Sequence, residues 1–381
     1  MEQIVPWLAL KSVPGIGNLI FNRLVGDFGS PEAVLCASSR RLSLVSGMTP
    51  RLVQAIRGYH CPDWVFMEIE RCTKKGFRII TQTSADYPAL LLHITDPPPL
   101  LYCYGALTAA QCHVAVVGSR KATAYGTINA KSLAGELAAN GIGVVSGMAR
   151  GIDTAAHIGA MEAGGRTVAV LGSGLECVYP AENLKLFHRI AENGCVISEF
   201  PLDAKPESHH FPQRNRIISG MALGTVVVEA ADRSGSLITA RLAAEQGREV
   251  FAVPGSIHAA TAQGTHSLIR QGAKLVEKAG DIIEEIAPQL CTAPDDQPPA
   301  PESSPHCREA SGQGLLSGEE SRLLETMGSY AVHIDELARR CNLEMSTLSA
   351  ILLQLELKGA VVQEPGKFFH ALPMEKIDRA K

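Results

Sequence analysis

VAVVGSR, at residues 114–120, is a short apolar run that ends in a small polar turn, and this pattern decides the fold. It recurs along the middle of the chain, where each apolar run is followed by Gly or Ser and then by a helical stretch. Runs this short and this apolar indicate strands that are buried on both faces. The predicted strands are 114–117, 144–145, 167–171, 195–198, 225–228, 250–253 and 274–276, and the predicted helices between them include 126–140, 154–163, 236–246 and 265–271. This alternation predicts an α/β fold with a doubly wound, mostly parallel sheet and helices on both faces.

The remaining chain divides around this α/β domain, which we place at residues 87–288. Residues 1–86 have a helical pattern and are expected to form a separate helical domain. Residues 289–316 are rich in Pro, Ser and acidic residues and nearly lack large apolar ones, so they cannot bury enough surface to fold and are expected to be a flexible linker. Residues 317–381 are predicted to form a small helical unit that ends in a hairpin, as in a winged helix.

The composition limits the class of protein and its partners. Of the 381 residues, 46% are apolar and 19% are charged, which is typical of globular domains. The formal net charge is −4, so a nucleic-acid site would have to be a local basic patch. The cysteines have no zinc-like spacing and suit free thiols in a reducing compartment, and no stretch is long enough to span a bilayer. A cytoplasmic location is expected.

The candidate ligand site lies where the strands end. In a doubly wound sheet, ligands bind outside the carboxyl ends of the strands, beside helix N-termini. Several loops at these positions combine Gly and Ser, and some also contain Arg: GSR at 118–120, SGMARGID at 146–153, GSG at 172–174 and RSGS at 233–236. Such loops either satisfy the turn geometry of the fold or offer amide and hydroxyl donors to phosphate oxygens. Their number, and the Arg residues among them, favour an anion site.

A second unusual stretch is FPQRNRIIS at 211–219, in which Arg214 and Arg216 flank Asn215. Arginine can bind phosphate or stack on a base, but it can also form ion pairs at a helix start, and both alternatives stay open from these residues alone. Asp153 is expected to be a helix N-cap and not a catalytic acid. His209 and His210 lack a carboxylate or cysteine at ligand spacing, so no metal site is expected.

Known signatures of nucleotide and hydrolytic sites are missing from the sequence. The GSG turn at 172–174 lacks the third glycine of a dinucleotide fingerprint, and there is no Walker A, HExxH or GxSxG motif. These absences favour a binding protein over an enzyme.

Several of the quoted stretches occur together, in the same order, in one known family. GSR at 118–120, SGMARGID at 146–153, FPQRNRIISG at 211–220, EAADRSGSLITARLAAEQGREVFAVPGS at 229–256 and GTHSLIRQGA at 264–273 resemble the DprA or Smf family of DNA-processing proteins. The resemblance implies an extended Rossmann-like fold with a helical N-terminal domain and a C-terminal winged helix. It also implies binding of single-stranded DNA without strong sequence preference, homodimerisation and loading of RecA in natural transformation. Neither an enzymatic activity nor a cofactor is expected.

The resemblance further assigns a set of DNA-binding residues. Arg120 is the main candidate for a phosphate contact, and Lys185 is placed at the family's second basic position. The full candidate set is Gly118, Ser119, Arg120, Gly147, Arg150, Gly151, Lys185, Arg214, Asn215, Arg216, Ser234, Gly235 and Ser236.

The flanking domains carry weaker signals. VPGIG at 13–17 and LVSGM at 44–48 resemble helix-hairpin-helix turns, which we interpret first as turns of a packing module, with phosphate binding as the alternative. The expected recognition helix of the winged helix, 344–358, has no Arg and a single Lys. Helices that read DNA are normally basic, so we expect this unit to bind protein or to regulate.

One enzymatic alternative remains. The central domain is also similar to Rossmann-like nucleotide-processing enzymes of the LOG type, whose signature is a PGGxGT turn followed by Glu. The corresponding residues here, 233–240, are RSGSLITA, without the paired glycines and the Glu. This difference favours DNA binding over hydrolysis.

Overall fold

The computed structural model describes residues 3–108 and 111–290, and in the C-terminal part the segments 323, 332–341, 347–348, 351–352, 354–355, 361–364 and 368–371. The chain forms two compact units, Met1–Asp295 and Asp296–Lys381, and each is described here by itself. Among the helices of these residues, none combines the length and the apolar character that crossing a membrane requires.

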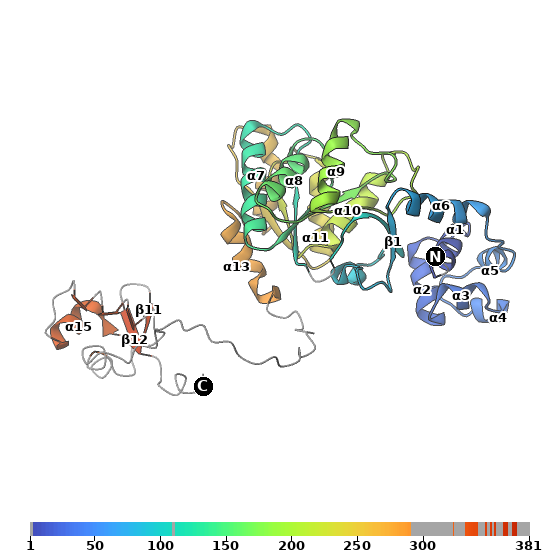
Figure 1. The fold of residues 1–381 in the computed structure, drawn as a ribbon. Helices are drawn as coiled ribbons and strands as arrows, with labels where there is room; N and C mark the ends of the chain where they lie inside the picture. The colour runs from blue at the N-terminus through green and yellow to red at the C-terminus, as the bar shows by residue number, and fades with distance from the viewer. Residues whose placement is uncertain are drawn as a thin grey trace, which may run out of the picture. The chain divides into compact units, whose positions relative to one another are not determined.

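A nine-stranded sheet is the centre of the first unit (Figure 1). Its order is β1-β2-β6-β5-β4-β3-β7-β8-β9, and all pairs from β6 to β9 are parallel, whereas β1 and β2 form an antiparallel edge beside β6. The predicted mostly parallel, doubly wound fold is therefore confirmed. The strands are β1 (Arg78–Thr81), β2 (Leu100–Gly105), β3 (His113–Val117), β4 (Gly143–Ser146), β5 (Thr167–Leu171), β6 (Gly194–Ser198), β7 (Gly224–Val227), β8 (Glu249–Ala252) and β9 (Lys274–Leu275).

Both faces of the sheet are covered because the side chains of each strand alternate between two cores. In β3, Val114 and Val116 pack into a core with α7, α8 and α13, whereas Ala115 and Val117 pack into the opposite core with α10 and α11. The helices of the first core are α7 (Ala124–Ala139), α8 (Ile152–Glu162) and α13 (Ala279–Leu290), and those of the second are α10 (His210–Gly220) and α11 (Gly235–Glu245). Two further helices, α9 (Leu184–Asn193) and α12 (Gln263–Arg270), complete the layers.

The antiparallel edge was not predicted. The sheet begins at Arg78, inside the range expected to be helical, because β1 pairs with β2 and β2 pairs with β6, almost a hundred residues away (Cys103 opposite Ile197). Such pairings leave no periodic signal in the sequence of a four-residue strand. The domain boundaries at 86, 288 and 316 remain predictions, although α13 runs to Leu290.

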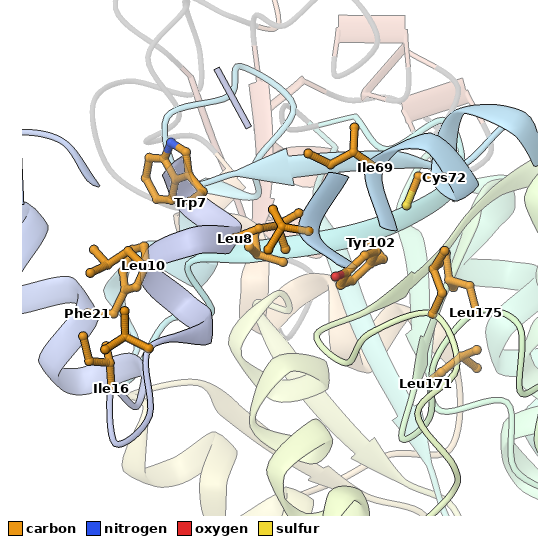
Figure 2. Packing of buried hydrophobic residues seen from close by; sticks show 14 of the residues in the cluster. Trp7, Leu8, Leu10, Ile16, Phe21, Ile69, Cys72, Tyr102, Leu171 and Leu175 are labelled. Carbon is orange, nitrogen blue, oxygen red and sulfur yellow. The ribbon is translucent and has the colours of Figure 1, made fainter. Parts of the chain in front are cut away.

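The N-terminal helices share a hydrophobic core with the edge of the sheet. Figure 2 shows Trp7 and Leu8 of α1 and Ile69 of α6 in the same cluster as Tyr102 of β2. Gly15 and Gly47 have positive φ angles of 88° and 87° in the turns that resemble helix-hairpin-helix motifs. These turns connect helices as expected, and their phosphate binding stays a prediction. The helices are α1 (Val5–Ser12), α2 (Asn18–Phe28), α3 (Pro31–Leu35), α4 (Ser39–Leu42), α5 (Pro50–Arg57) and α6 (Asp63–Lys74).

The C-terminal unit contains the predicted hairpin. Strands β11 (Val361–Glu364) and β12 (Phe368–Ala371) are antiparallel, and β12 also pairs with β10 (Val332–His333), which leads directly into α15 (Ile334–Cys341). The predicted linker from 291 onward and most of the helix predicted from 319 lie outside the described residues, as does much of the expected recognition helix.

Two buried histidines make the fold sensitive to acid. His157 of α8 is fully buried, with Nδ1 2.7 Å from the Thr167 hydroxyl, which itself donates to the Val144 carbonyl at 2.8 Å. Burial lowers the pKa of His157 from 6.5 to about 3 and that of His113 to about 4. Both rings are therefore neutral in the folded protein at pH values where the unfolded chain is protonated.

We expect the free energy of unfolding to fall as the pH is lowered from about 6.5 towards 4. In this window the unfolded state binds a proton on each histidine that the folded state does not bind. Each histidine therefore lowers the free energy of unfolding by up to about 1.4 kcal/mol for every unit that the pH falls below about 6.5. Urea unfolding of the wild type and of His157→Gln at several pH values measures this. An equal pH slope for the two proteins would contradict the assignment of His157.

Candidate nucleic-acid interface

The main pocket lies outside the carboxyl ends of β3 and β7. Strand β3 has β4 on one side and β7 on the other, so the strand order reverses between β3 and β7. The loops that follow these two strands lead away in opposite directions and leave a crevice between them. The crevice has a volume of about 600 Å³. Its lining includes Gly118, Ser119, Arg120 and Lys121 after β3, Phe211, Arg214 and Asn215 of α10, and Asp232, Arg233, Ser234, Gly235 and Ser236 at the start of α11.

A smaller pocket of about 200 Å³ adjoins this crevice. The two share Arg120, Lys121, Ala149, Phe211 and Arg214, and the residues that the smaller one adds include Gly147, Arg150 and Tyr179. We call the two together the strand-end groove. Ten of the thirteen predicted residues line the groove, namely Gly118, Ser119, Arg120, Gly147, Arg150, Arg214, Asn215, Ser234, Gly235 and Ser236. Gly151, Lys185 and Arg216 are not part of its lining.

Arg120 is an exposed cation that lines both pockets of the groove. Its guanidinium carbon lies 5.0 Å from the centroid of the Phe211 ring, and it forms no ion pair with any residue that the structure describes. Lys121 and Arg233 are also exposed in the lining, again without an ion pair among the described residues. These charges are therefore free to attract an anion. The predicted set omitted Lys121 and Arg233, although both directly adjoin predicted residues, GSR at 118–120 and SGS at 234–236.

The N-terminus of α11 opens onto the groove. Ser234 is its N-cap, and its hydroxyl accepts from the Ser236 amide at 3.4 Å and lies 2.8 Å from the Ser236 hydroxyl. A side-chain carbon at Gly235 would meet nothing within 4 Å, so a ligand can reach the backbone here. The exposed backbone at Gly235 and the helix dipole both favour a negative group at this end.

The N-terminus of α7, by contrast, is closed by the protein itself. The buried Glu229 carboxylate accepts from the Thr123 amide at 2.9 Å and from the Thr123 hydroxyl at 2.5 Å. The first strand-to-helix turn is where dinucleotide-binding folds hold a pyrophosphate. Because an acidic side chain occupies that position here, the groove differs from a dinucleotide site.

Arg214 forms the floor of the groove. It is 4% exposed, and its Nη1 donates to the Gly147 carbonyl at 2.7 Å and to the Val170 carbonyl. Burial lowers the pKa of Arg214 to about 10, with the nearby Asp153 carboxylate opposing this shift, so the guanidinium is charged at neutral pH. Arg214 thus connects the ends of β4 and β5 beneath the groove.

Two predicted glycines are required by packing. A Cβ at Gly147 would lie 2.3 Å from Arg214 Nη1, and Gly151 has a φ of 75° with the Ser119 carbonyl 2.3 Å from the position of a Cβ. The N-cap of α8 is Gly151, and Asp153 lies in the first turn of the helix. Its carboxylate accepts a hydrogen bond from the Ala149 amide, in the loop before the helix, at 3.3 Å. The N-cap interpretation of Asp153 was therefore wrong.

Arg150 and Lys185 differ from Arg120 in their surroundings. Arg150 lines the smaller pocket, but its Nε and Nη2 each donate to a Glu182 carboxylate oxygen at 2.7 Å. Lys185 is exposed on α9, outside the lining of the groove. Their DNA contacts stay predictions, and the Glu182 carboxylate already offsets the charge of Arg150.

Arg216 points away from the groove. It is 8% exposed, and its guanidinium pairs with the Glu199 carboxylate and lies 3.3 Å from an Asp96 carboxylate oxygen. Glu199 also accepts from the Asn18 side chain at 2.5 Å. Helix α10 therefore presents Arg214 to the groove and Arg216 to a buried polar junction with the N-terminal helices.

Aromatic side chains line one end of the groove. The Phe211 ring centroid is 5.8 Å from that of Tyr179, and the Tyr179 side chain is 43% exposed. Aromatic faces beside cations are the combination on which single-stranded nucleic acids bind, because bases stack while phosphates pair. Phe211 lay in the quoted stretch at 211–219, but neither Phe211 nor Tyr179 was among the predicted site residues.

The turn before α10 corrects the expectation about metal ligands. Glu207, His209 and His210 offer ligand atoms that all lie within 4.8 Å of one another. The carboxylate sits two residues before the histidines, and a turn at 207–210 brings it to them, which linear spacing alone did not indicate. Glu207 and His209 are exposed, and within the described chain no further ligand joins the group.

The motifs of this groove match one family. The model of DNA recombination-mediator protein A matches residues 78–287, beginning at the first strand of the sheet, and the DprA winged helix domain matches residues 294–367. The chain belongs to the DNA recombination-mediator protein A family. Protein Smf of Synechocystis sp. is 33% identical over 94% of this chain and 96% of its own length.

Solved structures of the family agree in fold. DNA processing protein A of Streptococcus pneumoniae superposes with a TM-score of 0.66 at 35% identity, covering 74% of this chain and 98% of that one. DNA processing protein A of Helicobacter pylori, whose structure was described for its single-stranded DNA binding mode, gives a TM-score of 0.50 at 29% identity over 56% of this chain and 96% of that one.

Proposed function

We propose that this member of the DNA recombination-mediator protein A family is a cytoplasmic protein that binds single-stranded DNA in the strand-end groove. The observation that carries the proposal is Arg120, an exposed guanidinium without an ion pair in the described chain, beside the Phe211 ring. The open N-terminus of α11 lies across the same pocket. Phosphates would be held by Arg120, Lys121 and the α11 amides, while bases would stack on the aromatic side chains.

The groove suits a single strand better than a duplex. Its aromatic side chains can stack only on bases whose faces are free, and bases in a duplex are already stacked on one another. Its cations lie on a protein with a net charge of −4, so the overall charge supplies no general attraction for a duplex. These donors would contact phosphate, and phosphate contacts carry no sequence information, which supports binding without base preference.

Fluorescence anisotropy with a labelled 20-nucleotide single strand and its duplex, across a salt series, tests the proposal. We expect the single strand to bind more tightly at every salt concentration, with an affinity that falls as salt rises because phosphate contacts release counterions. Equal binding of the single strand and the duplex at all salt concentrations would reject single-strand specificity.

Homodimerisation and loading of RecA are further parts of the proposal and rest on the family resemblance. Sedimentation across protein concentrations tests the dimer. RecA filament assembly on single-stranded DNA, with and without the protein, tests the loading role. A DNA-binding protein that leaves filament assembly unchanged would retain the first part of the proposal and lose this one.

Removal of residues 296–381 is expected to leave single-strand affinity within about threefold of the full chain. The cut lies at the boundary of the first compact unit, which contains the whole groove. The removed part has more acidic than basic residues after position 316, so it supplies no general attraction for DNA. A loss above tenfold, about 1.4 kcal/mol, would show that the winged helix contributes directly to binding.

A further inference from the structure

A separate pocket of about 430 Å³ lies beside the strand-end groove. It is formed by the first turn of α7 and the loop after β8, with Thr123, Tyr125, Pro254 and Ser256 in its lining, and Thr261 lines both this pocket and the groove. We call it the α7 pocket. Because residues 119–121 line the groove and residues 123 and 125 line the α7 pocket, one short segment of chain separates the two.

Tyr125 lines this pocket, and two further exposed apolar side chains, Ile128 and Ile257, are close in sequence to its lining residues. Tyr125 is 52% exposed, and its hydroxyl donates to the Pro254 carbonyl at 2.9 Å, which holds the ring at the rim. Ile257, in the same loop as Ser256, is 79% exposed, and Ile128, one helical turn after Tyr125, is 67% exposed. Large apolar side chains this exposed are a sign of a binding surface when they occur together.

We propose that the α7 pocket binds nucleobases of the same single strand whose phosphates lie in the strand-end groove, with Tyr125 as the stacking surface. This inference rests on the proposed function and extends it to a second subsite. A strand that leaves Arg120 and Lys121 in the direction of α7 reaches the rim of this pocket next.

The chemistry of the lining favours bases over phosphates. The described lining contains no Lys or Arg. It does contain the acidic residue Glu229, whose two carboxylate oxygens already accept hydrogen bonds from Thr123. A phosphate here would lack a counterion and would face a carboxylate. A neutral base has a π face for Tyr125 and apolar contact for Ile257, and base stacking is tolerant of sequence.

Tyr125→Ala tests the subsite. We expect it to weaken binding of a 20-nucleotide oligothymidine about tenfold, with an unchanged salt slope, because stacking is lost while the phosphate contacts stay. An oligonucleotide of abasic sites should bind wild type and Tyr125→Ala equally. Phe66→Ala is the matched control, since Phe66 is also 52% exposed but lies on α6, away from the groove.

Ile257→Asp is a second test variant, which keeps Tyr125 and its hydrogen bond to the Pro254 carbonyl. The added negative charge, next to the lining residue Ser256, should weaken oligothymidine binding by at least threefold, whereas Phe66→Asp should not change it beyond the small effect of net charge. If Tyr125→Ala and Ile257→Asp both bind like the wild type while Arg120→Ala is impaired, the subsite is wrong and the groove stands. If the wild type does not bind single strands, the proposed function itself fails.

Discussion

Arg214→Met is expected to lower the free energy of unfolding by about 3–5 kcal/mol. The substitution keeps most of the side-chain volume but removes one of the two arginines, Arg214 and Arg120, whose charges favour the ionised form of the buried Asp153 carboxylate. It also removes the donor to the Gly147 carbonyl. Removing a compensating cation from a buried carboxylate is strongly destabilising. Urea unfolding at pH 7 measures the loss, and a value within 1 kcal/mol of the wild type would contradict the role of Arg214 as the floor of the groove.

Two variants separate this effect from general damage to α10. Gln213→Met changes the preceding, exposed residue and should alter stability by less than about 0.5 kcal/mol. Arg214→Met combined with Asp153→Asn removes both charges and should recover part of the lost stability. Failure of the double variant to recover any stability would show that the carbonyl contacts, and not Asp153, dominate.

Arg120→Ala is expected to weaken single-strand binding about tenfold and to lower the salt slope by about one. The guanidinium has no ion pair in the described chain, so its loss should remove a phosphate contact without releasing a carboxylate. Arg120→Lys should recover only part of the affinity, because an ammonium lacks the planar pair of donors. Thermal unfolding should be unchanged, and a matching loss of stability would instead indicate that Arg120 holds the loop.

Two other arginines serve as controls for Arg120. Arg189 is exposed on α9 outside the groove, so Arg189→Ala should leave the affinity and the salt slope almost unchanged. Arg150 lines the smaller pocket but is held by Glu182 in a two-bond pair, so Arg150→Ala should have a smaller effect than Arg120→Ala. Equal losses for Arg150→Ala and Arg120→Ala would show that the Glu182 pair opens when DNA binds.

The strands and the loops of the groove could be predicted because their signals are local. Apolar runs followed by Gly, Ser and Arg marked β3 to β9 and placed GSR at 118–120 and SGS at 234–236 at carboxyl ends of strands, where a parallel sheet gathers its loops. The antiparallel strands β1 and β2 were missed, since their pairing with β6 depends on residues far away in the sequence.

The directions of the side chains were not predictable in the same way. Arg214 and Arg216 were treated as one motif, but residues two apart on a helix point to different sides, and the structure places one under the groove and the other beside Glu199. The spacing of two residues could therefore have indicated that only one of the two arginines faces the groove. The partner of Arg150, by contrast, is 32 residues away, and no pattern in the sequence indicates the Glu182 contact.

Photo-crosslinking of a single strand that carries 5-iododeoxyuridine tests the central claim most directly, because it locates the DNA on the chain. If the strand-end groove holds the strand, mass spectrometry should find crosslinks to Phe211 or Tyr179, whose rings lie beside Arg120 and within the smaller pocket. Arg120→Ala should reduce their yield at the same DNA concentration. Crosslinks confined to residues 1–77 or 296–381, with none in the groove, would contradict the account.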